Sequence, residues 1–127
     1  MVSKDTEYSC GLDAALAVIG GKWKALILWE LRDGSVRFGA LRRRVVGISE
    51  KMLIQQLREM EADGLVHREA FPEIPPRVEY SLTELGASLN DALLPLCDWG
   101  ERHVEAVRAA RAPAAQASGS RATISSA

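Results

Sequence analysis

Residues 38–83 read FGALRRRVVGISEKMLIQQLREMEADGLVHREAFPEIPPRVEYSLT, and this stretch decides the fold. It begins with Phe38, Leu41 and Val45, whose spacings of three and four are the period of a short amphipathic helix. Val46-Gly47-Ile48 then supplies the turn that a pair of helices needs. Ser49 favours the start of a second helix, because its hydroxyl can accept a hydrogen bond from a backbone N–H of the first turn.

The second predicted helix begins at Glu50 and ends before Gly64, a residue type that commonly terminates helices. Its two sides differ in chemistry. Leu53, Leu57 and Met60 lie on one side, and Lys51, Ile54, Gln55 and Arg58 lie on the other. The apolar side predicts packing against a core, and the polar side predicts a contact surface.

Two strands follow this pair of helices, at residues 65–71 and 78–82. The second alternates Val78, Tyr80 and Leu82 inward with polar residues outward. Pro72, Pro75 and Pro76 lie between the strands, where missing amide donors are tolerated at a hairpin tip. Helix, turn, helix, strand, tip and strand is the order of a winged helix-turn-helix, so the predicted fold class is α+β, mainly α, with the tip as the wing.

The remaining segments add helices to this unit. Residues 12–19 and 23–31 are predicted as helices, the second with Trp23, Leu26, Ile27 and Leu31 on a core stripe. Residues 35–38 have room for a short third strand. Thr83 caps a long last helix with an apolar stripe, which consists of Leu85, Leu89, Leu93, Leu96, Gly100, Val104 and Val107.

The apolar stripe of the last helix exceeds what one small domain can cover, which predicts a homodimer. The residues predicted at its interface are Leu12, Leu89, Leu93, Leu96 and Trp99. Along the chain we predict a flexible segment at residues 1–9, a winged domain with dimerisation helices at residues 10–111, and a disordered tail at residues 112–127.

Composition excludes several classes of protein. The chain has 127 residues, of which 47% are apolar, enough for one packed domain. It has no apolar run long enough to cross a bilayer and no signal-peptide pattern, so we expect a cytoplasmic protein without a membrane partner. Its two cysteines and two histidines form no metal-ligand spacing, and no catalytic motif or phosphate-binding glycine loop occurs. We therefore expect no metal, no cofactor and no enzymatic activity.

The net charge of −1 conceals a division along the chain. Residues 22–58 hold nine Lys and Arg against three Asp and Glu, and residues 59–103 hold three against ten. Phosphate binding depends on local clusters of cations, because charges act over about 10 Å at ordinary salt. The basic part contains the helix-turn-helix, which favours double-stranded DNA as a partner over a merely solvated basic surface.

Five residues are candidates for DNA contact. Ser49, Lys51 and Gln55 lie near the start of the second helix, where the helix dipole also favours phosphate, although Ser49 has the alternative role of a cap. Arg77 at the wing is a candidate for a phosphate or a minor-groove edge, with a solvated hairpin as the alternative. Arg37 is the last candidate, and pairing with an acidic neighbour is its alternative.

Cys10 lies directly before the first predicted helix, whose partial positive charge stabilises a thiolate and favours reaction with oxidants and electrophiles. Acidic neighbours such as Asp13 oppose this effect. Cys97 lies in the long apolar helix and is predicted to be a buried packing residue, with a disulfide to Cys10 of the other subunit as the alternative.

Several segments together resemble the HxlR-type transcription regulators, a winged-helix group related to the MarR-like repressors. The resemblance extends over about residues 10–103 and is carried by Cys10 and by the segments IGGKW (19–23), ISEKML (48–53), DGL (63–65), PPRVEY (75–80) and LTELG (82–86). The chain departs from the family pattern at Gly11, Gly39-Ala40 and Ile54, where the family commonly has proline, an acidic residue and threonine.

The resemblance implies a homodimeric regulator that is joined through its first and last helices and binds an inverted-repeat operator in double-stranded DNA. It also implies a response to oxidants, electrophiles or small metabolites. We therefore expect a transcriptional regulator with Cys10 as the redox-sensing residue. The alternatives are a regulator controlled by a non-covalent small-molecule effector and a winged-helix module for protein contacts.

Overall fold

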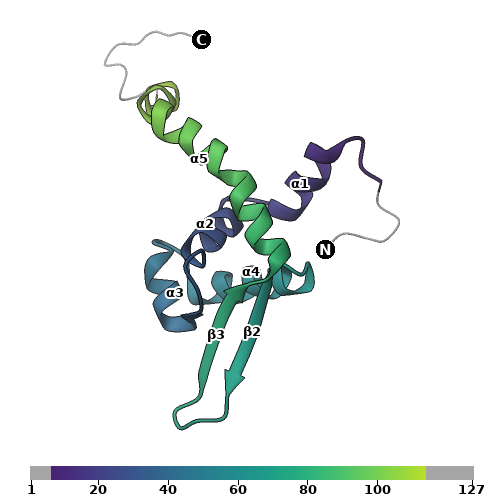
Figure 1. The fold of residues 1–127 in the computed structure, drawn as a ribbon. Helices are drawn as coiled ribbons and strands as arrows, with labels where there is room; N and C mark the ends of the chain where they lie inside the picture. The colour runs from purple at the N-terminus through teal and green to yellow at the C-terminus, as the bar shows by residue number, and fades with distance from the viewer. Residues whose placement is uncertain (1–6, 114–127) are drawn as a thin grey trace. The chain divides into compact units, whose positions relative to one another are not determined.

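The computed structural model describes residues 7–113, which form five helices and three strands (Figure 1). The helices are α1 (Gly11–Ile19), α2 (Lys22–Glu30), α3 (Phe38–Arg44), α4 (Glu50–Ala62) and α5 (Glu84–Ala110), and the strands are β1 (Val36–Arg37), β2 (Val66–Phe71) and β3 (Arg77–Leu82). This is the predicted winged helix-turn-helix with a long C-terminal helix. The predicted flexible residues 1–6 and the predicted tail from residue 114 lie outside the described residues. The limits proposed for the winged domain, 10 and 111, stay predictions.

The turn between α3 and α4 forms as its sequence predicts. Gly47 has a φ of 91°, which residues with a side chain rarely adopt. The Ile48 N–H donates to the Val45 carbonyl at 3.3 Å. The Ser49 hydroxyl accepts a hydrogen bond from the Met52 N–H at 3.1 Å, so Ser49 is the N-cap of α4.

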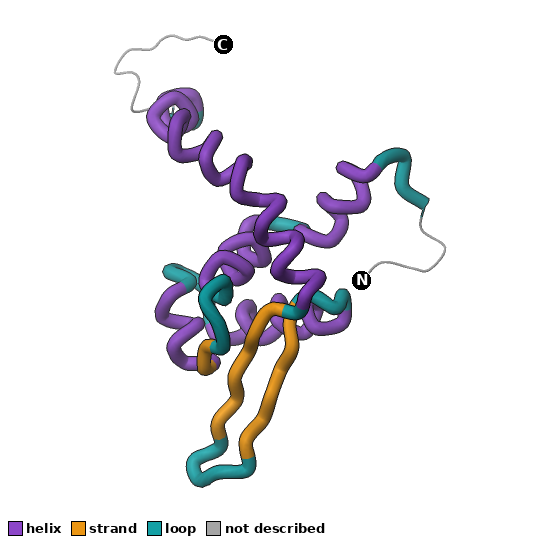
Figure 2. The backbone as a smooth tube through the Cα atoms, in the orientation of Figure 1, coloured by secondary structure: helices purple, strands orange, loops and turns teal. Residues whose placement is uncertain are grey.

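The three strands form one antiparallel sheet in the order β1-β3-β2 (Figure 2). Val36 of β1 lies opposite Tyr80, which confirms the predicted third strand. Along the hairpin, Val66 lies opposite Leu82 and Phe71 lies opposite Arg77. Tyr80 is buried and packs with the core, as the alternation along β3 predicts.

The core joins the inner sides of α2, α3 and α4 to one face of the sheet. Its fully buried members include the predicted Leu53, Leu57 and Met60 of α4. The prediction for α2 was wrong at Leu26, which is exposed, whereas Leu28 is completely buried. The buried stripe consists of Lys24, Ile27 and Leu28 of α2 and of Leu31 directly after the helix. Lys24 occupies a position where the helical period calls for an apolar residue.

The end of α4 and the start of α5 meet at a tightly bonded junction. Gly64 has a φ of 78° and ends α4, and the Leu65 N–H donates to the Met60 carbonyl at 2.8 Å. The Thr83 hydroxyl donates to the Gly64 carbonyl and accepts from the Gly86 N–H at 3.0 Å. Gly86 is buried so close to the Leu65 carbonyl that a Cβ there would overlap its oxygen. Thr83 is therefore the predicted cap, and Gly86 is required by packing.

The described residues divide into two compact units after Leu93, within α5. In the first unit, Leu89 and Leu93 pack against the core and are partly buried. In the second unit, Leu96, Cys97 and Trp99 are exposed. The prediction of a buried Cys97 was wrong, because this part of α5 is a single helix, which cannot cover its own faces. Among the described residues, no helix has both the length and the apolar character needed to cross a bilayer.

Candidate nucleic-acid interface

The outer side of α4 forms a polar surface that we call the recognition face. It consists of Glu50, Lys51, Ile54, Gln55 and Arg58. Spacings of three and four place these residues on one side of the helix, opposite the buried leucines. Lys51 and Gln55 are both exposed and one turn apart, as predicted.

Between α4 and the hairpin lies a groove of about 850 Å³, which we call the wing groove. Its floor includes Tyr80, and one wall is the recognition face itself, through Ile54 and Arg58. It is lined by Arg37, Phe38, Gly39, Glu50, Ile54, Arg58, Glu61, Arg68, Glu73, Pro75, Pro76, Arg77, Val78 and Tyr80. Four of these residues are arginines and three are glutamates, so the groove has a small excess of positive charge. Arg37 and Arg77 pair with glutamates. Arg58 and Arg68 form no ion pair within residues 7–113.

Arg77 holds the two strands of the wing together. Its guanidinium lies 3.8 Å from the centre of the Phe71 ring, and its two terminal nitrogens lie 3.0 Å from Glu73 Oε2 and 3.4 Å from Glu79 Oε2. Its side chain is only 25% exposed. Arg77 begins β3 rather than lying at the tip of the hairpin. It stabilises the wing, and its contact with DNA stays a prediction.

Arg37 has the acidic partner that the sequence offered as the alternative to DNA contact. Its Nε lies 4.0 Å from Glu79 Oε2, while 65% of its side chain remains exposed. Glu79 thus lies between Arg37 and Arg77, and it also lies opposite Glu69 across the sheet. The two arginines offset the repulsion between these carboxylates. Arg37 keeps enough exposure for a phosphate to approach it.

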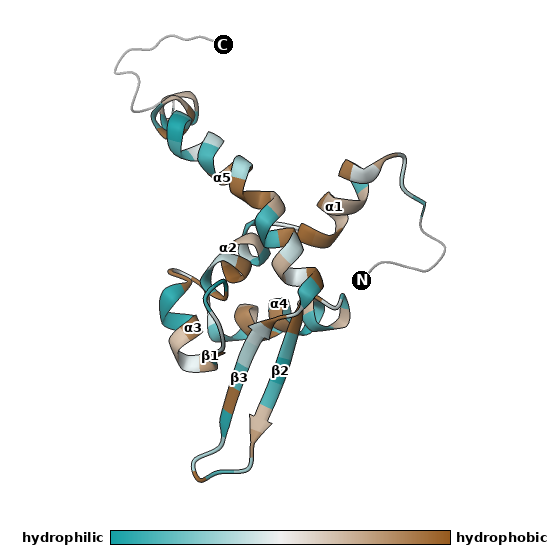
Figure 3. Ribbon diagram, viewed as in Figure 1, coloured by the Kyte–Doolittle hydropathy of each residue, from teal (hydrophilic) through white to brown (hydrophobic). Residues whose placement is uncertain are grey.

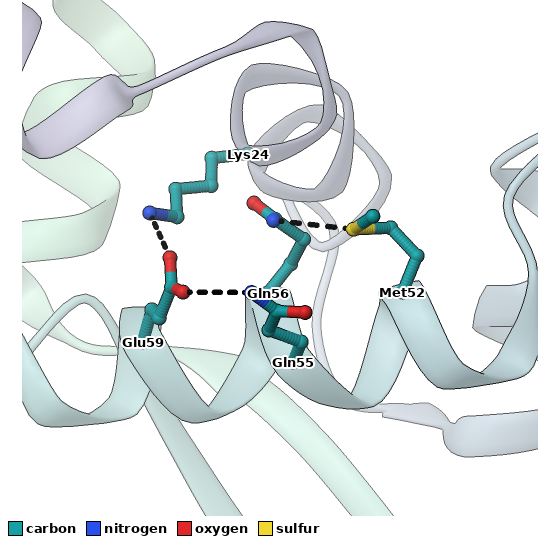
Figure 4. A network of polar contacts seen from close by, with 5 residues as sticks. All are labelled: Lys24, Met52, Gln55, Gln56 and Glu59. Atoms are coloured by element: carbon teal, nitrogen blue, oxygen red, sulfur yellow. Dashed lines mark hydrogen bonds and ion pairs between the residues drawn. The ribbon is translucent and has the colours of Figure 1, made fainter.

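An ion pair beneath the recognition face escaped the sequence analysis (Figure 4). Lys24 Nζ of α2 donates to Glu59 Oε1 at 2.6 Å, and Gln55 Nε2 donates to Glu59 Oε2 at 3.4 Å. The hydrogen bond from Lys24, and then that from Gln55, lowers the pKa of the Glu59 carboxyl below its usual range. Glu59 is therefore ionised at neutral pH. One feature of the sequence indicates this ion pair: Lys24 lies on the same side of its helix as residues 27, 28 and 31, which face the core. A buried ammonium needs an acidic partner.

Cys10 is exposed at the N-cap position of α1, with extended backbone. The backbone N–H of Asp13, and to a smaller degree that of Leu12, stabilises the thiolate and lowers the pKa of the Cys10 thiol. The Asp13 carboxylate accepts hydrogen bonds from the backbone N–H and hydroxyl of Ser9, at 3.3 and 3.2 Å. The thiol pKa is therefore lowered, as the sequence predicts, and the side chain is also exposed, which together favour reactivity.

The residues predicted at a dimer interface fall into two groups. Leu12 is 67% exposed and Leu96 is 64% exposed, and Trp99 is about half exposed. Leu89 and Leu93 instead pack partly against the core of their own chain. Figure 3 shows that α1 is largely apolar along its length. Within residues 7–113, no three His, Cys, Asp or Glu side chains come together to hold a metal ion.

Comparison with known proteins gives a consistent result. A family model described as HxlR-like helix-turn-helix matches residues 18–108. An uncharacterised HTH-type transcriptional regulator of Methanothermobacter thermautotrophicus is 50% identical over 99 residues, which are 78% of this chain and 76% of the relative.

Two similar solved structures are those of regulators in their reduced form. The redox regulator HypR in its reduced form matches with a TM-score of 0.73 and 44% identity, over 79% of this chain and 99% of that chain. The reduced form of the transcriptional regulator YodB from Bacillus subtilis matches with a TM-score of 0.64 and 34% identity, over 73% of this chain and 92% of that chain.

Proposed function

Because the chain belongs to the HxlR-like helix-turn-helix family of transcriptional regulators, we propose that it binds an inverted-repeat operator as a homodimer and that Cys10 makes its DNA affinity respond to oxidants or electrophiles. The observation that carries the proposal is the recognition face, which presents Lys51 and Gln55 beside a groove lined by four arginines. Regulation, rather than catalysis, is the activity of this family.

The recognition face suits a major groove. A helix placed there meets base edges with the side chains of its first turns, and Lys51 and Gln55 lie in those turns of α4. The phosphate backbone of the duplex would then follow the wing groove, where Arg58, Arg68 and Arg37 supply positive charge. The Ser49 hydroxyl caps α4 by accepting from the Met52 N–H, and we propose that the helix start beside it contributes to phosphate binding.

The proposed dimer uses apolar residues that the described chain leaves exposed. Leu12 and Leu16 of α1 and Leu96 and Trp99 of α5 are all exposed. Exposed large apolar side chains that lie on the same helices are typical of an interface with a partner subunit. Two recognition helices in a two-fold dimer would read half-sites about one helical turn, or a multiple of it, apart.

The proposed sensor is Cys10, whose exposure and lowered thiol pKa support reaction with oxidants. HypR is named a redox regulator, which supports the same chemistry here by similarity. A second cysteine, Cys97, is also exposed and is a candidate partner for a disulfide between subunits. The competing proposal is a non-covalent effector, in which case thiol chemistry would leave DNA affinity unchanged.

Duplex selection followed by titration at several salt concentrations tests the DNA proposal. The protein should select an inverted repeat, and its affinity should fall steeply with salt. Lys51→Ala should weaken binding and lower the slope of log affinity against log salt by about one if the lysine contacts phosphate. Arg108→Ala, which removes one cation from the far end of α5, is the matched control and should change neither quantity. Salt-independent or absent duplex binding by the wild type would overturn the proposal.

Gel shifts with and without diamide test the sensor. The wild type and Cys97→Ser should both respond if Cys10 alone is modified, whereas Cys10→Ser should not respond. If diamide changes the DNA binding of the wild type but of neither cysteine variant, and a non-reducing gel shows a cross-linked dimer, Cys97 is the disulfide partner of Cys10. An equal response of Cys10→Ser and wild type would remove Cys10 from the mechanism.

A further inference from the structure

We propose that the partly buried Lys24–Glu59 ion pair orients the side-chain amide of Gln55, so that Gln55 reads an adenine in each operator half-site. This inference rests on the proposed DNA binding and goes beyond it, since it assigns a base and a positioning residue. The recognition face by itself leaves the orientation of the Gln55 amide open. Lys24 and Glu59, which lie behind that face, set this orientation.

Lys24 sets the position of the Glu59 carboxylate. The side chain of Lys24 is only 10% exposed and lies on the buried stripe of α2 with Ile27 and Leu28. Its ammonium lies 2.6 Å from Glu59 Oε1. This short contact is a charge-assisted hydrogen bond, which holds the two side chains together. Oε1 is thereby occupied, and Oε2 is the oxygen that faces Gln55.

Glu59 sets the orientation of the Gln55 amide. Gln55 and Glu59 are four residues apart on α4, and Gln55 Nε2 lies 3.4 Å from Glu59 Oε2. An ionised carboxylate can only accept hydrogen bonds, so the amide must turn its nitrogen toward Glu59. Figure 4 shows the amide oxygen of Gln55 directed away from Glu59. Rotating the amide by half a turn would bring two acceptors together.

The fixed amide presents one acceptor and one donor to the groove. One N–H of Gln55 is used by Glu59, while the oxygen and the second N–H remain for a base. Adenine offers the complementary pair in the major groove, an N6 amine that donates and an N7 that accepts. Guanine offers two acceptors, O6 and N7, and O6 would face the amide oxygen. Cytosine and thymine each lack the second matching group.

The first test compares base preferences of variants on randomised duplexes. Gln55→Ala should abolish the preference for adenine at one position of each half-site. Glu59→Ala should lower the discrimination between adenine and guanine at that position from about tenfold or more to near unity. Glu61→Ala removes the same charge from the same helix without touching Gln55, and it should keep the adenine preference. A merely structural role for Glu59 would weaken all sequences alike.

The second test uses only the wild-type protein and so does not depend on how a variant folds. Purine in place of adenine removes the N6 amine, and 7-deazaadenine removes N7; each should weaken operator binding at that position about tenfold. The inference is overturned if the position relaxed by Gln55→Ala prefers guanine or thymine, if Glu59→Ala retains the adenine preference, or if both analogues bind like adenine. Salt-dependent duplex binding with one of these results removes the inference alone, whereas absent duplex binding removes the proposed function as well.

Discussion

The thiol of Cys10 owes its character to the backbone that follows it. The amides at the start of α1 stabilise the thiolate, and the side chain is exposed to solvent. A thiol with a lowered pKa is ionised, and hence nucleophilic, at a lower pH than a free cysteine. The effect exists only while α1 is folded, because the amides of Asp13 and Leu12 must converge on one point.

We therefore expect iodoacetamide to alkylate Cys10 with a pH midpoint lower in the folded protein than in the same chain unfolded in urea. Folding lowers the pKa of the thiol, so the rate in the folded protein should rise at lower pH. Peptide mass spectrometry after timed quenching measures the rate at Cys10 separately from that at Cys97. Coincident midpoints in the folded and unfolded chain would contradict the stabilising role of the α1 amides.

The wing is held together by ionic contacts as well as by the backbone hydrogen bonds between β2 and β3. Arg77 stacks on Phe71 and pairs with Glu73 and Glu79, and so ties both strands and the tip to each other. These contacts use the flat shape and the fork of nitrogens that arginine has and lysine lacks. A lysine ammonium at the same position would have no flat face to stack on Phe71 and no planar fork to reach the two carboxylates.

Arg77→Lys is accordingly expected to loosen the wing although it keeps the charge. Hydrogen exchange of the amides in residues 66–82 should accelerate, and operator affinity should fall for all sequences together. Arg68→Lys serves as the control, because Arg68 forms no ion pair in the part of the chain that the structure describes. Unchanged exchange in Arg77→Lys would mean that only the charge at this position matters.

The second prediction for the structural elements concerns the junction of α4 and α5. Gly86→Ala should destabilise the protein by about 2 kcal/mol or more, because its Cβ would overlap the carbonyl oxygen of Leu65 and a backbone atom cannot move aside cheaply. Gly39→Ala is the control, since the new Cβ would meet only the end of the Arg43 side chain at 3.7 Å. It should be neutral or stabilising by up to about 1 kcal/mol. Chemical denaturation of both variants measures these changes in the free energy of unfolding.

Local signals were enough to predict the elements, and they failed where a distant partner decides the outcome. The cap Ser49, the stripe of Leu53, Leu57 and Met60, and the hairpin are set by neighbours in sequence. Lys24 could not be assigned, because its partner Glu59 is 35 residues away in the chain. A polar residue at position 24 also conceals the helical period that places Leu28, and not Leu26, in the core. Likewise, a sequence alone does not show that Arg77 is enclosed by its neighbours.

At the scale of the whole molecule, the exposed apolar residues allow the proposed assembly to be tested separately from folding. Leu12 and Leu96 are exposed, so charged residues there should leave the subunit folded and disrupt only its association. Leu89 and Leu93 are less informative sites, because they pack against the core and a charge there would also unfold the chain.

The double variant Leu12→Glu and Leu96→Glu is expected to sediment as a monomer with a normal circular dichroism spectrum. Ile74→Glu is the matched control, since Ile74 is a fully exposed apolar residue at the wing tip, outside the proposed interface. It should sediment as a dimer. A dimer that survives both glutamates would place the interface elsewhere on the chain.

The hydroxyl of Thr83 is bonded at once to the end of α4 and to the start of α5. The Thr83 N–H also donates to the Leu65 carbonyl at 3.1 Å, and Gly86 packs against the same carbonyl. The junction of α4 and α5 is therefore closely packed as well as hydrogen-bonded. These contacts join the first turn of α5 directly to the C-terminal end of α4, so we expect a movement of one to shift the other. Because α4 is one continuous helix from Glu50 to Ala62, a tilt at its C-terminal end would displace Lys51 and Gln55 near its N-terminal end.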